Sequence, residues 1–116
     1  MQRNMDLVRT ILSWIEHSPS GWEAPPFGIA GFTPEQVSYH AHIMTEDGLL
    51  ERIASARSGN PVYSLTWKGH EFLDLARDQK RWNQAKATID KVSSAPISVW
   101  MKVLHDLMLK ELGVAS

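Results

Sequence analysis

The fold is decided by residues 33–69, which read TPEQVSYHAHIMTEDGLLERIASARSGNPVYSLTWKG. This stretch opens with a complete helix start signal, because Thr33 is a good N-cap, a proline follows it and Gln36 stands three residues after the cap. After an Asp-Gly stop, residues 50–53 and 62–65 are short β-rich runs around a polar loop that contains glycine. The stretch therefore predicts a helix followed by a β-hairpin.

Helices are predicted on both sides of this stretch. Residues 6–17 carry apolar side chains at three- and four-residue spacing, and residues 27–29 are expected to form a short extended segment. Thr66 is expected to cap a third helix that continues past residue 80 as the longest element of the chain. Residues 97–112 form a last amphipathic pattern.

The length of 116 residues predicts one domain over residues 1–116. The expected fold class is mainly α with a small β-hairpin (α+β), because helices carrying a two-stranded hairpin are arranged as in a winged helix-turn-helix. We expect a winged-helix core over residues 5–76 and a C-terminal helical extension over residues 77–113, which could mediate dimerisation.

Composition excludes several classes of protein. The chain has no cysteine, so disulfide scaffolds, thiolate metal sites and cysteine nucleophiles are excluded. His40 and His42 are two residues apart and would lie on different helix faces, which does not suit a shared metal ion. No phosphate loop, nucleophile elbow or run of about 18 apolar residues is present. We therefore expect a cytoplasmic protein that is not an enzyme and has no membrane segment, cofactor, metal or small-molecule ligand.

Several motifs resemble those of a bacterial and phage family called domain of unknown function 2513. The most specific are VSYH at residues 37–40 leading to DGLL at residues 47–50, and LTWKGHEFLD at residues 65–74. Residues 5–12, 31–35 and 77–83 are similar to it too. The resemblance implies a small winged-helix protein, often carried by prophages, with no assigned activity. The chain departs from the family pattern in a proline-rich insert at residues 21–27 and at Ala41.

Our first functional hypothesis is that the chain binds double-stranded DNA as a transcriptional regulator. In winged helices one helix most often enters the major groove while the hairpin lies against the backbone. Against this hypothesis, residues 1–62 carry four basic and seven acidic side chains, a net charge of −3, whereas phosphate neutralisation supplies much of the affinity for DNA. The candidate DNA-binding residues are Ser38, Tyr39, His42 and Thr45 on the helix and Arg52, Arg57 and Asn60 in the hairpin.

The alternative hypothesis is a protein-interaction module in which the winged helix is only a scaffold. The C-terminal helices carry large apolar side chains of the kind that is enriched at interfaces, and a homodimer would cover them. The same side chains would equally pack the two helices against each other and against the first helix. The interface candidates are Trp82, Ile89, Trp100, Met101, Leu104 and Met108.

Overall fold

A computed structural model describes residues 2–91 and 95–113. Within these residues the chain has five helices and a three-stranded antiparallel sheet, so the predicted α+β class is confirmed. The chain forms two compact units, Met1–His70 and Glu71–Ser116. The division lies inside a helix, shortly before the boundary expected after residue 76, and each unit is described by itself.

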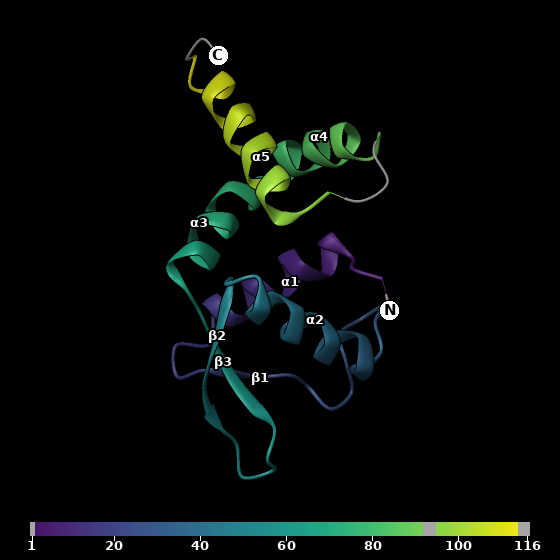
Figure 1. Cartoon of the computed structure of the whole chain (residues 1–116), viewed down its shortest axis with the longest axis vertical. Helices are drawn as coiled ribbons and strands as arrows, with labels where there is room; N and C mark the ends of the chain where they lie inside the picture. Colours follow the sequence, from purple (N-terminus) through teal and green to yellow (C-terminus); the bar gives the residue numbers. More distant parts are fainter. Residues whose placement is uncertain (1, 92–94, 114–116) are drawn as a thin grey trace. The chain divides into compact units, whose positions relative to one another are not determined.

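The first unit contains two helices and the whole sheet (Figure 1). The strand order is β1-β3-β2, and both pairs of strands are antiparallel. The helix α1 packs on α2 and β3, and α2 packs on β2. In chain order the elements are α1 (Met5–Glu16), β1 (Trp22–Glu23), α2 (Pro34–Glu46), β2 (Leu50–Ser55) and β3 (Pro61–Leu65).

The start of α2 is as predicted. The Gln36 backbone N–H donates to Thr33 Oγ1 at 3.1 Å, and the Thr33 N–H donates to Gln36 Oε1 at 2.8 Å, which completes a capping box. The predicted inward residues Val37, Ala41 and Met44 are buried. This side of α2 therefore faces the core, and the opposite side is left to solvent.

The prediction of an extended segment at residues 27–29 is wrong. The strand lies earlier, at Trp22–Glu23, where Trp22 pairs with Tyr63 and Glu23 with Val62. Residues 27–29 instead enter a turn closed by an isolated bridge between Ile29 and Phe32. Two strand residues carry no periodic pattern of their own, so only the pairing with β3 identifies them.

The hairpin is longer than predicted and contains an irregularity. Arg52 pairs with Tyr63 and Ala54 with Val62, so Ile53 is the extra residue of a β-bulge. Ile53 is 47% exposed. The bulge lies on β2, an edge strand of the sheet.

The helix α3 (Trp67–Ala76) begins directly against the turn that ends α2. Thr66 Oγ1 accepts the Gly69 N–H at 3.0 Å, so Thr66 caps α3 as predicted. A Cβ at Gly69 would overlap the carbonyl oxygen of Leu49. Glycine is therefore required at this close approach of helix and turn.

The third helix does not continue past residue 80, which corrects that prediction. It ends at Ala76, and a separate helix, α4 (Gln79–Ile89), follows. The Asp78 carboxylate accepts the Arg81 backbone N–H at 2.8 Å and so starts α4 as its N-cap. The last helix, α5 (Ile97–Glu111), packs on α4 in the second unit.

Candidate functional site

The solvent side of α2 carries a row of exposed side chains at helical spacing, which we call the α2 stripe: Glu35, Ser38, His42 and Glu46. His42 Nε2 lies 3.5 Å from Glu46 Oε1. The stripe therefore begins and ends with a carboxylate and contains no lysine or arginine.

The structure separates the four DNA-binding candidates of this helix into two pairs. Ser38 and His42 are exposed on the α2 stripe, whereas Tyr39 and Thr45 are half-buried. Thr45 Oγ1 donates to the Ala41 carbonyl at 2.8 Å, and the Tyr39 ring meets the His40 ring edge-on at a centroid distance of 5.7 Å. Only Ser38 and His42 are thus fully presented to a partner.

The hairpin candidates differ in how they are held. Arg57 is exposed in the loop. Arg52 Nη2 donates to Ser55 Oγ at 2.7 Å. Asn60 Nδ2 donates to Glu23 Oε2 at 2.8 Å, and Ser58 Oγ donates to the same oxygen at 3.0 Å. Sequence reasoning missed Glu23, because only the pairing of β1 with β3 brings this acid to the hairpin loop.

A cavity of about 280 Å³ lies between α2 and the hairpin, and we call it the α2–hairpin cavity. One of its lining residues, Tyr63, is only 8% exposed. The Tyr63 hydroxyl has no hydrogen-bond partner among the residues that the structure describes. The lining residues are Ser38, Ala41 and His42 from α2, with Ala24, Asn60, Pro61 and Tyr63 from the residues around β1 and β3.

The surroundings of this cavity are acidic. None of its lining residues is a lysine or an arginine, and Glu23 and Glu46 each contact a lining side chain. Residues 1–70 carry five Lys/Arg and seven Asp/Glu side chains, a formal net charge of −2. Within residues 2–91 and 95–113, no group of three or more His, Asp and Glu side chains could hold a metal ion. The site is therefore suited to neutral or cationic groups.

Most of the predicted interface residues in the second unit are buried. The Trp82 ring lies 5.0 Å from the Trp100 ring and 6.4 Å from the Phe72 ring, measured between centroids. Ile89 and Leu104 are also buried, whereas Met101 and Met108 are half-buried. The four buried side chains are not available to a partner in this conformation, and the homodimer stays a prediction.

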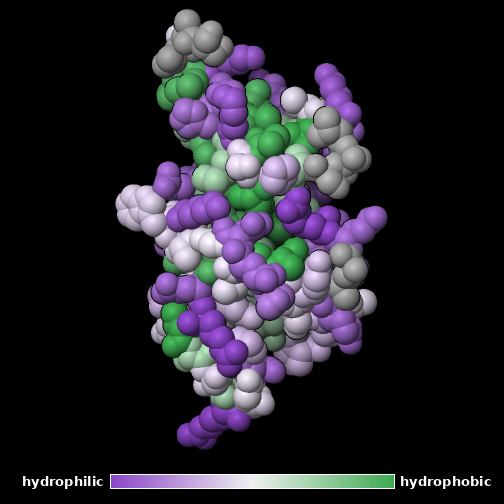
Figure 2. Space-filling model, viewed as in Figure 1, coloured by the Kyte–Doolittle hydropathy of each residue, from purple (hydrophilic) through white to green (hydrophobic). Residues whose placement is uncertain are grey.

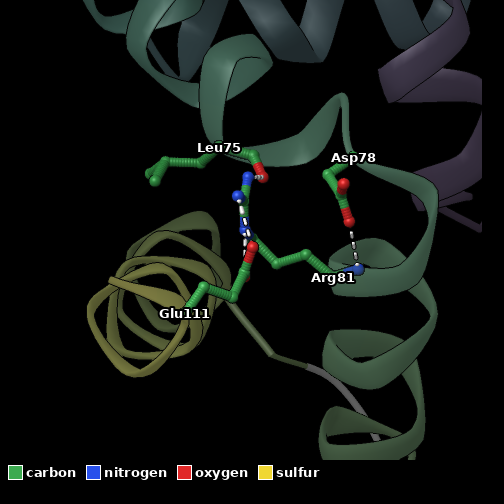
Figure 3. A network of polar contacts seen from close by, with 4 residues as sticks. All are labelled: Leu75, Asp78, Arg81 and Glu111. Atoms are coloured by element: carbon green, nitrogen blue, oxygen red, sulfur yellow. Dashed lines mark hydrogen bonds and ion pairs between the residues drawn. The ribbon is translucent and has the colours of Figure 1, made fainter. Parts of the chain in front are cut away.

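An ion pair between the buried Arg81 and the exposed Glu111 also holds the second unit together (Figure 3). The Arg81 guanidinium donates to both carboxylate oxygens of Glu111, from Nε at 2.7 Å and from Nη2 at 2.9 Å. Its Nη1 donates to the Leu75 carbonyl at 2.8 Å. The hydrogen bonds and charge of Arg81 lower the pKa of Glu111. A second cavity, of about 450 Å³, borders this pair. The Arg81 guanidinium that lines it already has hydrogen-bond partners in Glu111 and Leu75.

The two units also differ in the hydropathy of their surfaces. Figure 2 shows hydrophilic side chains at the tip of the hairpin and hydrophobic side chains gathered among α4 and α5. None of the described helices combines the length and the apolar character that crossing a membrane requires.

These features define a class of small α+β protein in which a helix, a hairpin and the cavity between them form the candidate site. The chain belongs to the family described as "Hypothetical protein (DUF2513)", whose sequence pattern matches residues 2–96, so the resemblance noted from the motifs is confirmed. The chain is 40% identical, over 97 residues, to an uncharacterised protein of Haemophilus influenzae. The aligned region covers 80% of this chain and 82% of that protein. No solved structure matches the chain.

Proposed function

We propose that this protein is a winged-helix-type binding module whose α2 stripe and hairpin bind a basic segment of a partner protein. The observation that carries the proposal is the α2 stripe, which presents Ser38 and His42 between the carboxylates of Glu35 and Glu46. The proposal is one of binding and assigns no catalytic activity to the chain.

The winged-helix assignment is part of the proposal and is supported by the order of elements in the first unit. A helix, a short strand, a second helix and a two-stranded hairpin follow one another along the chain. The second helix keeps one face free, and the hairpin lies next to it, as a winged helix requires. This arrangement is a fold analogy, so the choice of partner depends on the side chains.

The charges favour a basic partner over a nucleic acid. A duplex carries one phosphate charge per ~1.7 Å of its axis, and proteins bind it largely by placing lysine and arginine against those phosphates. The α2 stripe would instead place Glu35 and Glu46 there. The same carboxylates attract a polypeptide rich in lysine and arginine, and complementary charge of this kind raises both association rate and specificity.

Double-stranded DNA is the second candidate partner, because two observations favour it. Arg52 and Arg57 are exposed on the hairpin, where they could contact phosphates. Ser38 and His42 could also donate hydrogen bonds to base edges. In this alternative, a duplex would have to bind despite the net charge of −2 on residues 1–70.

A direct comparison of the two partners tests the proposal. Fluorescence anisotropy is measured with a labelled Arg/Lys-rich peptide and with a labelled duplex, each at about 50 mM and about 150 mM salt. We expect the peptide to bind and the duplex not to bind. Reversing both stripe carboxylates, Glu35→Lys with Glu46→Lys, should weaken peptide binding by about tenfold, the equivalent of two exposed ion pairs.

The matched control reverses two exposed acids of the second unit, Glu71→Lys with Asp90→Lys, so that the net charge changes equally. Peptide binding that falls equally in both double variants would show an effect of net charge alone and would contradict the proposal. Retention of the duplex at about 150 mM salt, lost with Arg52→Ala and Arg57→Ala, would establish the DNA alternative instead.

A further inference from the structure

We infer that the cavity of about 450 Å³ in the second unit, which we call the α4–α5 cavity, binds the phosphate group of an organic phosphomonoester. The phosphate would lie between Lys80 of α4 and Lys110 of α5. This inference concerns the second unit and is independent of the proposed function, which depends on the first. The lining residues are Asp78, Lys80, Arg81 and Gln84, with Leu107, Lys110 and Glu111 from α5.

Lys80 and Lys110 bring unpaired positive charge to the cavity from two different helices. Neither ammonium group makes a hydrogen bond or a close ion pair with the residues that the structure describes. The pKa of Glu111 is lowered by the hydrogen bonds and charge of Arg81, and the charge of Lys80 also lowers it. Lys80 on α4 therefore acts on the same end of α5 that carries Lys110.

The two carboxylates of the lining already have partners. Both oxygens of Glu111 accept hydrogen bonds from the Arg81 guanidinium, and the Asp78 carboxylate accepts the Arg81 backbone N–H (Figure 3). The charges of Arg81 and Glu111 balance each other. The lining as a whole holds three cations against two carboxylates, so the positive charge that is left over is that of the lysines.

Two free ammonium groups match a dianion better than a singly charged anion. A phosphomonoester carries a charge of about −1.5 to −2 at pH 7 and offers three strong acceptor oxygens. A carboxylate or a sulfate monoester carries only one negative charge, so it would leave one of the two lysines unpaired. The charge of the cavity therefore favours a phosphomonoester among the common organic anions.

Other donors at the cavity can serve the remaining phosphate oxygens. Arg81 uses three of its five N–H groups within the described part of the chain, for Glu111 and the Leu75 carbonyl. The Gln84 side-chain amide lines the cavity and has no hydrogen-bond partner among the described residues. The cavity also lies beside the first turn of α4, where the helix dipole favours an anion.

The size and the apolar part of the cavity suit an organic ester. Its volume lies within the range of about 300–1,000 Å³ that is usual for ligand pockets, and an inorganic phosphate would fill only a small part of it. Leu107 and the methylene stems of the two lysines provide apolar surface for the organic group.

The experiment uses two anions of similar shape and different charge. The isotope-labelled full chain is titrated with phenyl phosphate and with phenyl sulfate, at about pH 7.5 and about 50 mM salt. We expect phenyl phosphate to shift the backbone amide signals of Lys80, Gln84 and Lys110 in the NMR spectrum. Phenyl sulfate should bind about tenfold more weakly or less, and so should inorganic phosphate, which has no apolar group.

Variants assign the effect to the two lysines. Lys80→Gln with Lys110→Gln should weaken binding of phenyl phosphate by about tenfold or more, because two charge-assisted hydrogen bonds are lost. The control, Lys91→Gln with Lys102→Gln, removes the same charge from exposed positions of the second unit outside the lining. It should change the affinity by no more than about twofold, and both spectra should stay those of a folded chain.

Three outcomes would overturn the inference: equal affinity for phenyl phosphate and phenyl sulfate, unchanged affinity in the Lys80 and Lys110 double variant, or equal weakening in the control. Inorganic phosphate that binds as tightly as phenyl phosphate would overturn the assignment to an organic ester. A phosphoserine tripeptide distinguishes two sources of the same group. Tighter binding of the tripeptide would support a phosphorylated partner chain, and tighter binding of phenyl phosphate would support a small molecule.

Discussion

Acidification should destabilise the first unit through one buried histidine. His40 is 1% exposed, and its two ring nitrogens are held by backbone groups with fixed roles. Nδ1 lies 2.7 Å from the Gln36 carbonyl, which can only accept, and Nε2 lies 2.8 Å from the Asn4 N–H, which can only donate. The ring must therefore be neutral, with its proton on Nδ1.

Burial lowers the pKa of His40 below the ordinary value of 6.5, and the nearby charge of Arg3 lowers it further, although the hydrogen bond to Gln36 opposes them. The unfolded chain therefore binds a proton at a higher pH than the folded chain. Stability is fully present above pH 6.5 and falls as the pH decreases toward the folded pKa, by at most about 1.4 kcal/mol per pH unit.

The total loss can be estimated from the contacts. Protonated Nε2 carries an N–H that faces the Asn4 N–H, so a donor of this 1% exposed ring is left without an acceptor. An unmet donor of this kind costs about 1–3 kcal/mol, so we expect a loss of that size as acid protonates His40. Urea unfolding should be followed between pH 7.5 and about 5, above the range in which most carboxylates titrate.

Two variants separate His40 from other titrating groups. His40→Gln should abolish the pH dependence in this range, whereas His70→Gln, which replaces an exposed histidine, should retain it. A wild-type midpoint that does not change between pH 7.5 and 5, or an equal slope in His40→Gln, would refute the argument from the ring's two hydrogen bonds.

Further substitutions test the packing at Gly69, the helix cap at Asp78 and the ion pair at Glu111. Gly69→Ala should destabilise the chain by about 1–3 kcal/mol in urea, because its Cβ overlaps the Leu49 carbonyl, whereas Trp67→Ala, at a side chain 80% exposed, should change stability by less than about 0.5 kcal/mol. Asp78→Ala should reduce stability by about 1 kcal/mol and Asp78→Asn by much less, and equal effects would contradict the capping role. Glu111→Gln should lower the urea midpoint at pH 7. Because the pKa of Glu111 is depressed, the difference from wild type should shrink as the pH falls below 4.5.

Local signals in the sequence predicted the elements that local chemistry determines. The capping box at Thr33 and Gln36 specified the start of α2, and the paired β-rich runs specified the hairpin. The break between α3 and α4 was missed although its signal was local. Asp78 is a good N-cap, but the apolar spacing across it resembled one continuous helix.

The candidate site was only partly predictable, because long-range pairing assembles it. Ser38, His42 and Asn60 were identified from the sequence as polar residues on the right elements. Tyr63 was not, and neither was Glu23, which the pairing of β1 with β3 brings next to Asn60, one of the residues that line the cavity. The alternation of Val62 and Tyr63 along β3 indicates that they face opposite sides of the sheet, but not what lies opposite.

The bulge at Ile53 also bears on how this protein behaves when it is crowded. A regular edge strand offers unpaired backbone groups on which another chain can add a strand, and this is a common start of aggregation. In β2 the extra residue interrupts that row of groups and increases the local twist. The bulged residue, Ile53, is an exposed isoleucine. Without the bulge, β2 would present both unpaired backbone groups and an apolar side chain at the same edge, a combination that favours aggregation. The irregularity thus lets the hairpin keep an exposed edge without becoming a template for strand addition.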